Sequence, residues 1–272
     1  MRTVAIDWSG ARVGAERHIW LAEAAEPGRL VRLEGGRSRE AVGAALQHLD
    51  DTHVAIGIDF AFGVPAWFAH QLGLASAPQL WALAERCGED WLRTCQPPFW
   101  GRRGRPRPTL PGSPLRQTER QVPPTAGILP KSIFQIGGPG AVGTGSIRGM
   151  PLLGRLRAAG AAIWPFDPPG WPLVVEIYPR LLSGPVHKSQ PAVRRRLLEQ
   201  RYPSLDPAHL AAATESEDAF DAAISALVML EHAHDLASLP PEADPIVRLE
   251  GRIWHPGWRA EVRLPTEQGG LA

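Results

Sequence analysis

Three short apolar runs, each ended by an acid, constrain this chain more than any other feature of its 272 residues. The runs and their acids are Thr3–Ile6 before Asp7, Val54–Ile58 before Asp59, and Leu173–Val175 before Glu176. Apolar runs of this length that are rich in β-branched residues are typical of buried strands. In open α/β sheets, binding sites lie where the strands end. We therefore expect an α/β fold with a site built from these acids.

The surrounding pattern agrees with this fold class. The runs His18–Ala24 and Arg29–Leu33 have strand character and are separated by a Pro27-Gly28 turn, which predicts an antiparallel meander. Ser38–Leu49 has one apolar face and a capping serine, which predicts a helix leading into the second buried strand. Further helices are expected at Pro65–Leu74, Ala77–Cys95, Met150–Ala159, Ala192–Arg201 and Glu217–His234, and a strand at Val247–Trp254.

The middle of the chain breaks this regular pattern. Half of the 28 glycines and 28 prolines lie in residues 97–172, so this stretch cannot be continuous helix or strand. We interpret residues 61–149, approximately, as an insertion that begins with helices and continues as Gly/Pro/Arg-rich loops. The length fits one large domain over residues 1–272 that carries this insertion.

Composition excludes several classes of protein. With 44% apolar residues and a net charge of +1, the chain is not a disordered protein. Its apolar runs are shorter than the roughly 18 residues that a membrane span needs, and its start lacks a secretory signal, so we expect a cytoplasmic protein that is not bound to membranes. Cys87 and Cys95 are too few for a disulfide framework or a zinc site, and we interpret them as packing residues.

The last long helix adds two more acids, Asp218 and Asp221, which are three residues apart and share one face. Each acid taken alone is explained as a turn residue or as an acid at a helix N-terminus. If the strands are neighbours, however, the acids converge and repel one another, and a divalent cation removes that penalty. Carboxylate oxygens are the ligands that Mg²⁺ and Mn²⁺ prefer. Two such ions about 3.5–4 Å apart can cleave a phosphodiester bond.

Four motifs in this order carry a resemblance to a known family. They are Val4-Ala-Ile-Asp7-Trp-Ser-Gly-Ala11, Ile56-Gly-Ile-Asp59-Phe-Ala-Phe-Gly-Val-Pro65, Glu176-Ile-Tyr-Pro-Arg180 and Asp218-Ala-Phe-Asp221-Ala222. The set resembles domain-of-unknown-function family 429, which is described as predicted RNase H-like nucleases. The last motif is also similar to the final helix of the Holliday-junction resolvases. The resemblance leaves residues 75–142, approximately, unmatched.

The resemblance implies an RNase H-like mixed sheet of five strands in the order 3-2-1-4-5, flanked by helices, with the insertion between strands 4 and 5. It places Asp7 on the central strand, Asp59 on its neighbour, and Asp218 and Asp221 on the last helix, as ligands of Mg²⁺ or Mn²⁺. Glu176 would end the fifth strand as a further catalytic acid. Such folds do not require a carboxylate there, so Arg180 of the same motif is an alternative, placed at a phosphate.

Two loop segments predict contacts with phosphate. Residues 101–120 carry six arginines against one acid, and arginine binds phosphate through two donors at once. We expect nucleic acid to be bound by Arg102, Arg103, Arg105, Arg107, Arg180 and the ring of Trp100. The alternative is a solvated loop kept soluble by its charge. Residues 137–146 are glycine-rich and precede a helix, so they form either a phosphate cradle or a flexible connector.

These observations favour a divalent-metal-dependent nuclease that acts on DNA or RNA through a two-metal mechanism. One alternative is a nucleic-acid-binding module of the same fold without catalysis. Another is an ATP-dependent phosphotransferase, because Asp7-Trp-Ser-Gly10 is similar to the first phosphate loop of the actin and sugar-kinase superfamily. The chain is too short for the two domains that such phosphotransferases use. No serine stands in the context of a catalytic triad.

Overall fold

The predicted strands assemble into one mixed sheet. In the computed structural model, which describes residues 1–49, 53–125 and 127–258, the strand order is β3-β2-β1-β4-β6-β5, and β7 also pairs with β6. The strands are β1 (Arg2–Asp7), β2 (Trp20–Glu26), β3 (Arg29–Gly35), β4 (Val54–Ile58), β5 (Ala162–Ile163), β6 (Leu173–Ile177) and β7 (Ile253–Trp254). The first three form the antiparallel meander, and β1, β4 and β6 are parallel neighbours. The α/β class is confirmed, with a seven-stranded sheet instead of the five strands expected.

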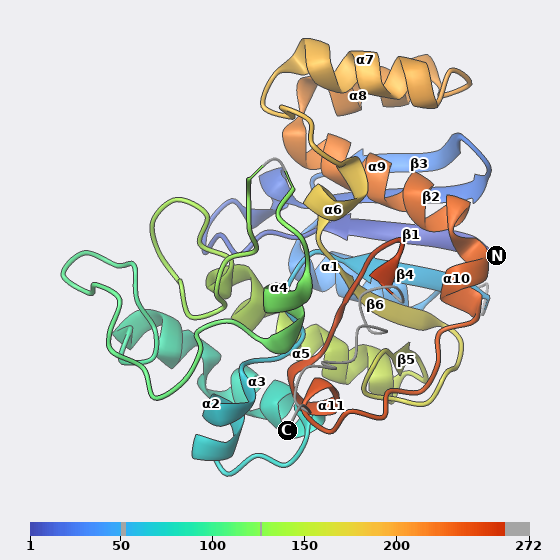
Figure 1. The fold of residues 1–272 in the computed structure, drawn as a ribbon. Coiled ribbons are helices and arrows are strands. Elements are labelled where there is room, and N and C mark those ends of the chain that lie inside the picture. Colours follow the sequence, from blue (N-terminus) through green and yellow to red (C-terminus); the bar gives the residue numbers. More distant parts are fainter. Residues whose placement is uncertain (50–52, 126, 259–272) are drawn as a thin grey trace, which may run out of the picture.

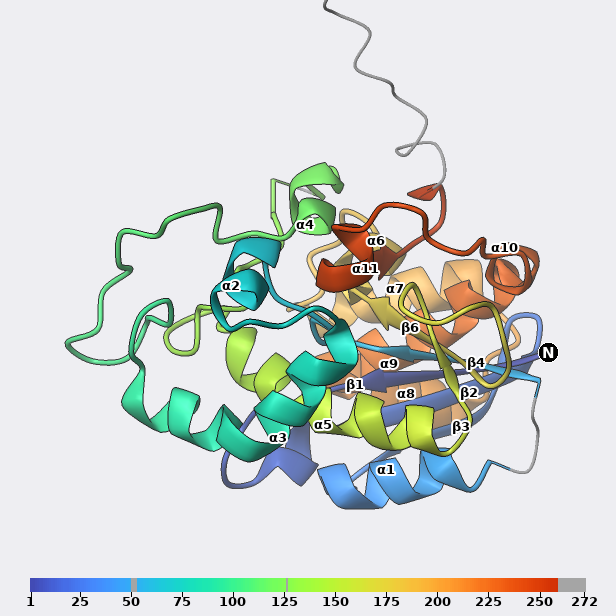
Figure 2. The same cartoon turned by 90° about the horizontal axis from the view of Figure 1, so that it is seen from below.

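Helices cover both faces of the sheet (Figure 1). The helices are α1 (Arg39–Gln47), α2 (Ala66–Gln71), α3 (Ala77–Thr94), α4 (Gln117–Gln121), α5 (Gly143–Ala158), α6 (Pro179–Ser183), α7 (Pro191–Arg201), α8 (Pro207–Glu215), α9 (Glu217–Glu231), α10 (Ala233–Ala237) and α11 (Val247–Glu250), with a 3-10 turn at Ala15–His18. Helix α9, backed by α7 and α8, lies on one face. Helices α1, α5 and α3 lie side by side on the other (Figure 2).

The central strands are apolar on both faces because each face is covered. Ile6 and Ile58 belong to the core on the α3–α5 side, whereas Ala5 and Ala55 belong to the core under α9. The residues facing α9 are small, which lets the helix lie close to the sheet. A Cβ atom on Gly57 would lie 2.5 Å from the Met229 sulfur. This close approach brings the polar first turns of α9 within reach of the strand ends.

The glycine-rich segment is more ordered than the sequence suggests. The helix expected to begin at Met150 begins at Gly143, so residues 143–146 form its first turn and are not a flexible connector. The glycines of α5 allow close packing. A Cβ atom on Gly149 would lie 2.5 Å from the Phe60 ring. Near the start of the helix, the loop residue Gly10 packs so closely that a Cβ atom on it would lie 2.2 Å from the backbone nitrogen of Gly145. Tertiary packing here overrides the low helix propensity of glycine.

Two other predictions differ from the structure. Only Ile253–Trp254 of the strand expected over Val247–Trp254 is a strand, because α11 occupies the first half and ends at Gly251, whose φ is +85°. The last long helix ends at Glu231, and a separate short helix, α10, follows it. Among the described residues, no helix is long and apolar enough to cross a membrane.

Candidate functional site

Asp7 and Asp59 lie side by side where two parallel strands end. Ile6 of β1 is level with Ile58 of β4, and the backbone N–H of Asp59 donates to the Ile6 carbonyl oxygen at 3.1 Å. Side chains alternate along a strand, so both acids share the face of Ala5, which is the face covered by α9. Asp7 is buried. The sheet thus brings the first two predicted acids together under a helix.

Helix α9 supplies the next two acids. The Thr3 hydroxyl at the start of β1 donates to the Ala226 carbonyl oxygen late in α9 at 2.8 Å, so the helix runs opposite to β1 and begins near Asp7. Asp221 is buried, whereas the Asp218 side chain is 35% exposed and one of its oxygens lies 3.0 Å from Nδ1 of His18. We refer to Asp7, Asp59, Asp218 and Asp221 as the aspartate cluster.

Lys188 also belongs to this site, although no motif in the sequence points to it. It lies in the loop between α6 and α7 and forms an ion pair with Asp221, and its ammonium is 3.6 Å from a Glu217 oxygen. One signal in the sequence could have found it. The chain has only two lysines, Lys131 and Lys188, among 29 basic residues.

Burial and the mutual repulsion of the acids both act on the pKa values of the cluster. Burial, followed by the charges of Asp221 and Asp59, raises the pKa of Asp7 well above its ordinary value. Burial and the charge of Asp221 raise the pKa of Asp59 to about 8. Burial also raises the pKa of Asp221 to about 6, against the opposing charge of Lys188. One carboxylate oxygen of Asp221, Oδ1, is buried without a hydrogen-bond partner among the described residues.

Glu176, the fifth predicted acid, lies on the opposite face of the sheet. It is level with Ile58 and therefore points to the α3–α5 side, where it lines the same cavity as Asp59. Both of its oxygens have partners. Arg116 donates to both of them, with Nη1 2.8 Å from Oε2, and the backbone N–H of Phe62 donates to Oε2 at 2.9 Å. Glu176 is thus a fully partnered acid, and its charge contributes to raising the pKa of Asp59.

Arg116 lies at the centre of a second acid group, which we call the Arg116 cluster: Arg116, Glu119 and Glu176. The guanidinium is 1% exposed, donates from Nε to Glu119 at 2.8 Å, and donates from Nη1 to the Glu250 carbonyl oxygen at 3.0 Å. Burial alone would lower the pKa of Arg116, but Glu119 and Glu176 raise it above its ordinary value. Arg116 and Glu119 therefore do not belong to the exposed basic loop in which the sequence places them.

A cavity of about 180 Å³ adjoins the aspartate cluster at Asp59. The glycine-rich segment forms one wall, where the Trp8 indole donates to the Gly145 carbonyl oxygen at 3.1 Å. Its lining includes Asp59, Trp8, Gly10, Lys131, Gly145 and Tyr178. Lys131 thus lies on the cavity that Asp59 also lines.

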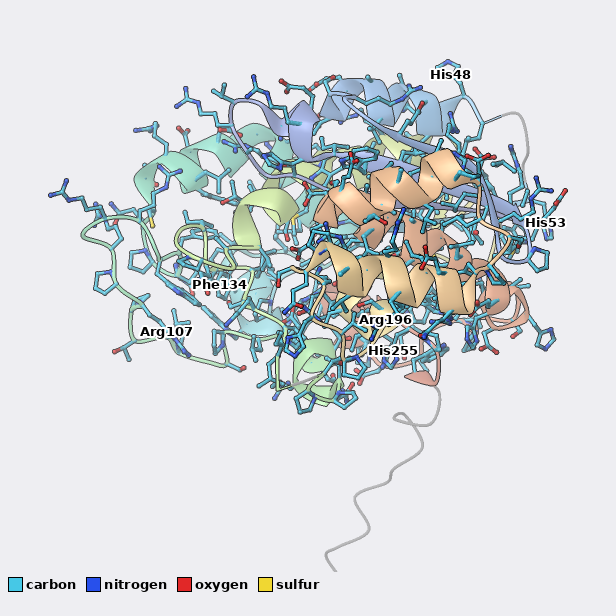
Figure 3. The ribbon with its side chains drawn as sticks, turned by 90° about the horizontal axis from the view of Figure 1, so that it is seen from above. His48, His53, Arg107, Phe134, Arg196 and His255 are labelled. Carbon is cyan, nitrogen blue, oxygen red and sulfur yellow. The ribbon has the colours of Figure 1, made fainter. Side chains whose placement is uncertain are left out.

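The residues predicted to bind nucleic acid lie in two separate places, on the loop before α4 and near Asp221. Arg102, Arg103, Arg105 and Arg107 are exposed on the loop before α4, where Figure 3 labels Arg107. Trp100 is 9% exposed, packs beside Phe134 and lies under the Arg107 guanidinium, 5.5 Å from it, so it offers little ring surface for a base. Arg180 donates to the Val186 carbonyl oxygen at 2.6 Å, and its charge lowers the pKa of Asp221, which puts it near the aspartates.

Comparison of this chain with protein-family models, curated proteins and solved structures found no match. Within the described parts of the chain, no three His, Cys, Asp or Glu side chains stand as a ready-made metal cage. Cys87 is half-buried and Cys95 buried, and neither is in a disulfide. The site must therefore be interpreted from its own geometry.

Proposed function

We propose that this chain is a divalent-metal-dependent nuclease that hydrolyses phosphodiester bonds at the aspartate cluster. The observation that carries the proposal is the unbalanced charge of the cluster, in which Asp7 and Asp221 are buried and Oδ1 of Asp221 has no partner. Buried charges are normally paired or bound to a metal. A donor set made only of carboxylate oxygens suits Mg²⁺ or Mn²⁺. Asp7, Asp59 and Asp221 would hold the cation, with Asp218 at the exposed edge.

Each part of the site has a place in this reaction. A bound cation would polarise the phosphate and the attacking water. The water oxygen forms a bond to phosphorus, the bond from phosphorus to the leaving oxygen breaks, and the leaving oxygen takes up a proton. Asp218 and His18 form the solvent-exposed end of the cluster, where the proton from the water can pass to solvent. The buried acids hold the reacting groups in place by position and charge.

The topology supports an RNase H-like fold for this proposal. An antiparallel three-strand meander is followed by two strands parallel to the first, in the order β3-β2-β1-β4-β6. The acids lie at the end of the central strand β1, directly after its neighbour β4, and on α9. This arrangement agrees with the four-motif resemblance, apart from the buried and partnered Glu176.

The basic residues provide a route for the substrate. Arg180 lies near the cluster and is proposed to contact a phosphate, and the arginines of residues 102–107 are proposed to bind the backbone further along the strand. Because Trp100 is buried, we propose that this loop contacts phosphate and does not stack on bases.

Cleavage of a labelled panel tests the proposal: single-stranded and duplex DNA, RNA, an RNA–DNA hybrid and a four-way junction. Each is incubated with Mg²⁺, Mn²⁺ or EDTA, beside Asp7→Asn and Asp218→Asn variants. We expect metal-dependent cutting by the wild type that Asp7→Asn abolishes. Salt-sensitive binding without cutting would instead identify a non-catalytic nucleic-acid-binding module.

A phosphotransferase is the second candidate, favoured by the cavity beside Asp59. Gly10 and Gly145 line that cavity, with the first turn of α5 at its wall, and a phosphate could approach the backbone there. Calorimetry with ATP and Mg²⁺ tests this candidate. Tight ATP binding together with an absence of cleavage on every nucleic acid would favour it over the nuclease.

A further inference from the structure

The cavity beside Asp59 extends well beyond the aspartate cluster. Its lining also includes Arg116, Glu119 and Glu176, so it reaches from Asp59 to the whole of the Arg116 cluster. The cleavage step proposed above uses only the Asp59 end. The remaining part of the cavity therefore offers a place for another part of a bound molecule.

The walls of this cavity are rich in aromatic rings. Trp8, Phe60 and Tyr178 all line it. The rings of Trp8 and Phe60 form a pair, with centroids 5.4 Å apart and planes inclined at 54°, so they make two adjoining walls. The hydrogen bond from the Trp8 indole to the Gly145 carbonyl oxygen fixes one of these rings in place. Aromatic walls favour a flat ligand with an apolar face, and a nucleobase is such a ligand.

The floor of the cavity is polar and fixed. Arg116, Glu119 and Glu176 are buried there and are held by hydrogen bonds to one another. Oε2 of Glu119 accepts from the backbone N–H of Arg116 at 2.6 Å, and a carboxylate oxygen has about two acceptor positions. The floor can therefore still accept hydrogen bonds from N–H groups at the edge of a base. A purely apolar ligand would take water from these groups and replace none of their hydrogen bonds.

The rim combines a cation with exposed apolar side chains. Lys131 and Val142 line the cavity and are both exposed. Ile128 and Leu129, shortly before Lys131 in the chain, are 41% and 51% exposed. Exposed apolar side chains beside a pocket are typical of a contact surface. An ammonium next to apolar surface suits the phosphate and sugar of a nucleotide.

We infer that the cavity holds one unpaired base of a nucleic-acid strand, with an adjoining phosphate of that strand at Asp59, so that the chain acts on single strands. The volume of about 180 Å³ is below the roughly 300–1,000 Å³ of pockets that hold drug-sized ligands, so it admits one base and excludes a base pair. A base in a duplex would first have to leave its stack. The inference rests on the proposed function and deepens it by naming the substrate class.

Photochemical cross-linking tests this inference without relying on cleavage. The probe is a short single-stranded DNA with 5-iodouracil in place of thymine, which bonds to aromatic side chains that it contacts when irradiated. It is mixed with the full chain in Ca²⁺ and in EDTA, alone or annealed to its complement, and mass spectrometry locates the cross-links. We expect cross-links at Trp8, Phe60 or Tyr178, with a roughly tenfold lower yield from the duplex. Cross-links confined to other residues, none in either condition, or equal yields from both probes would overturn the inference.

Narrowing the cavity by Ala141→Leu provides a second test. Ala141 is half-buried on the cavity lining, so a larger side chain takes up space there and leaves every charge and ring in place. The cross-link yield should fall on the order of tenfold. Ala158→Leu is the matched control, because Ala158 is exposed at the other end of α5, roughly 20 Å along the helix axis. Equal yields from the two folded variants would contradict a base in the cavity.

The outcomes separate this inference from the proposed function. A chain that cross-links through the cavity rings but cleaves no member of the substrate panel would refute the nuclease and keep the base site. A chain that cleaves single strands and duplexes at equal rates, with its cross-links elsewhere, would keep the nuclease and refute the base site.

Discussion

Two acid groups lie at the same end of one sheet, on opposite faces, and they differ in how their carboxylates are partnered. In the Arg116 cluster, one guanidinium pairs with Glu119 and Glu176, and both Glu176 oxygens accept hydrogen bonds. In the aspartate cluster, Lys188 is the one cation paired with the inner acids among the described residues, and an oxygen of Asp221 has no partner. The carboxylate oxygens of the first group all accept hydrogen bonds, and those of the second do not all do so.

The difference teaches how to separate structural acids from functional ones. Asp7 and Asp221 are buried, as are the acids of the Arg116 cluster, so burial does not distinguish them. The hydrogen bonds and ion pairs of the acids do distinguish the two groups. A buried charge without enough partners costs folding free energy, and such costs concentrate at functional sites. The Arg116 cluster joins α4, β6 and the chain around α11. The aspartate cluster is instead the group that we propose to bind a cation and a phosphate.

The largest effect is expected from breaking the aspartate cluster by Asp7→Asn. This substitution keeps the shape but removes a charge that the proposed cation needs, so metal-dependent cleavage should fall on the order of a thousandfold or more. Single-turnover cleavage rates measure the loss. Retention of wild-type rates would remove Asp7 from the proposed mechanism.

Breaking the Arg116 cluster should cost stability instead. Glu176→Gln leaves the buried Arg116 short of one anionic partner, and breaking a buried pair in this way typically costs about 3–5 kcal/mol. Urea denaturation should show a lower free energy of unfolding, with metal affinity retained. A loss of metal binding in a folded variant would show that Glu176 belongs to the metal site after all.

Asp59→Asn should raise the free energy of unfolding of the metal-free protein, whereas Glu176→Gln lowers it. The pKa of Asp59 is raised from 3.8 to about 8, so the folded state keeps a proton that the unfolded state releases. Stability from this residue is therefore lost as the pH rises through that window. The substitution should stabilise the metal-free chain by about 1–3 kcal/mol near pH 8 and flatten the pH dependence. Denaturation at several pH values checks both, and destabilisation at pH 8 would contradict the charge argument.

The smallest effect concerns the exposed arginines. Replacing Arg102, Arg103, Arg105 and Arg107 by glutamine should weaken nucleic-acid binding equally for all sequences and reduce the salt dependence by roughly one unit per lost phosphate contact. The control replaces Arg195 and Arg196 on α7, which are also exposed. Equal loss in both variants would mean that the loop is only a solvated, charged segment.

The sequence predicts the strands, the acids that end them and the Asp-x-x-Asp helix, because alternation and helical spacing are local signals. Partners distant along the chain are not local. Arg116 lies 60 residues from Glu176, and Lys188 lies 33 residues from Asp221. Which face Glu176 occupies depends on strand register, since one residue along a strand moves a side chain to the other face. The glycines of α5 look like loop residues until Phe60 and Gly10 pack on them.

Stabilisation by metal tests the contrast between the two clusters most directly. The free energy of unfolding is measured with and without Mg²⁺ for the wild type, Glu176→Gln and Asp59→Asn. We predict that Mg²⁺ stabilises the wild type, stabilises Glu176→Gln by a similar amount from a lower starting value, and has little effect on Asp59→Asn. Equal stabilisation of all three proteins, or none in the wild type, would contradict a cation site at the aspartate cluster.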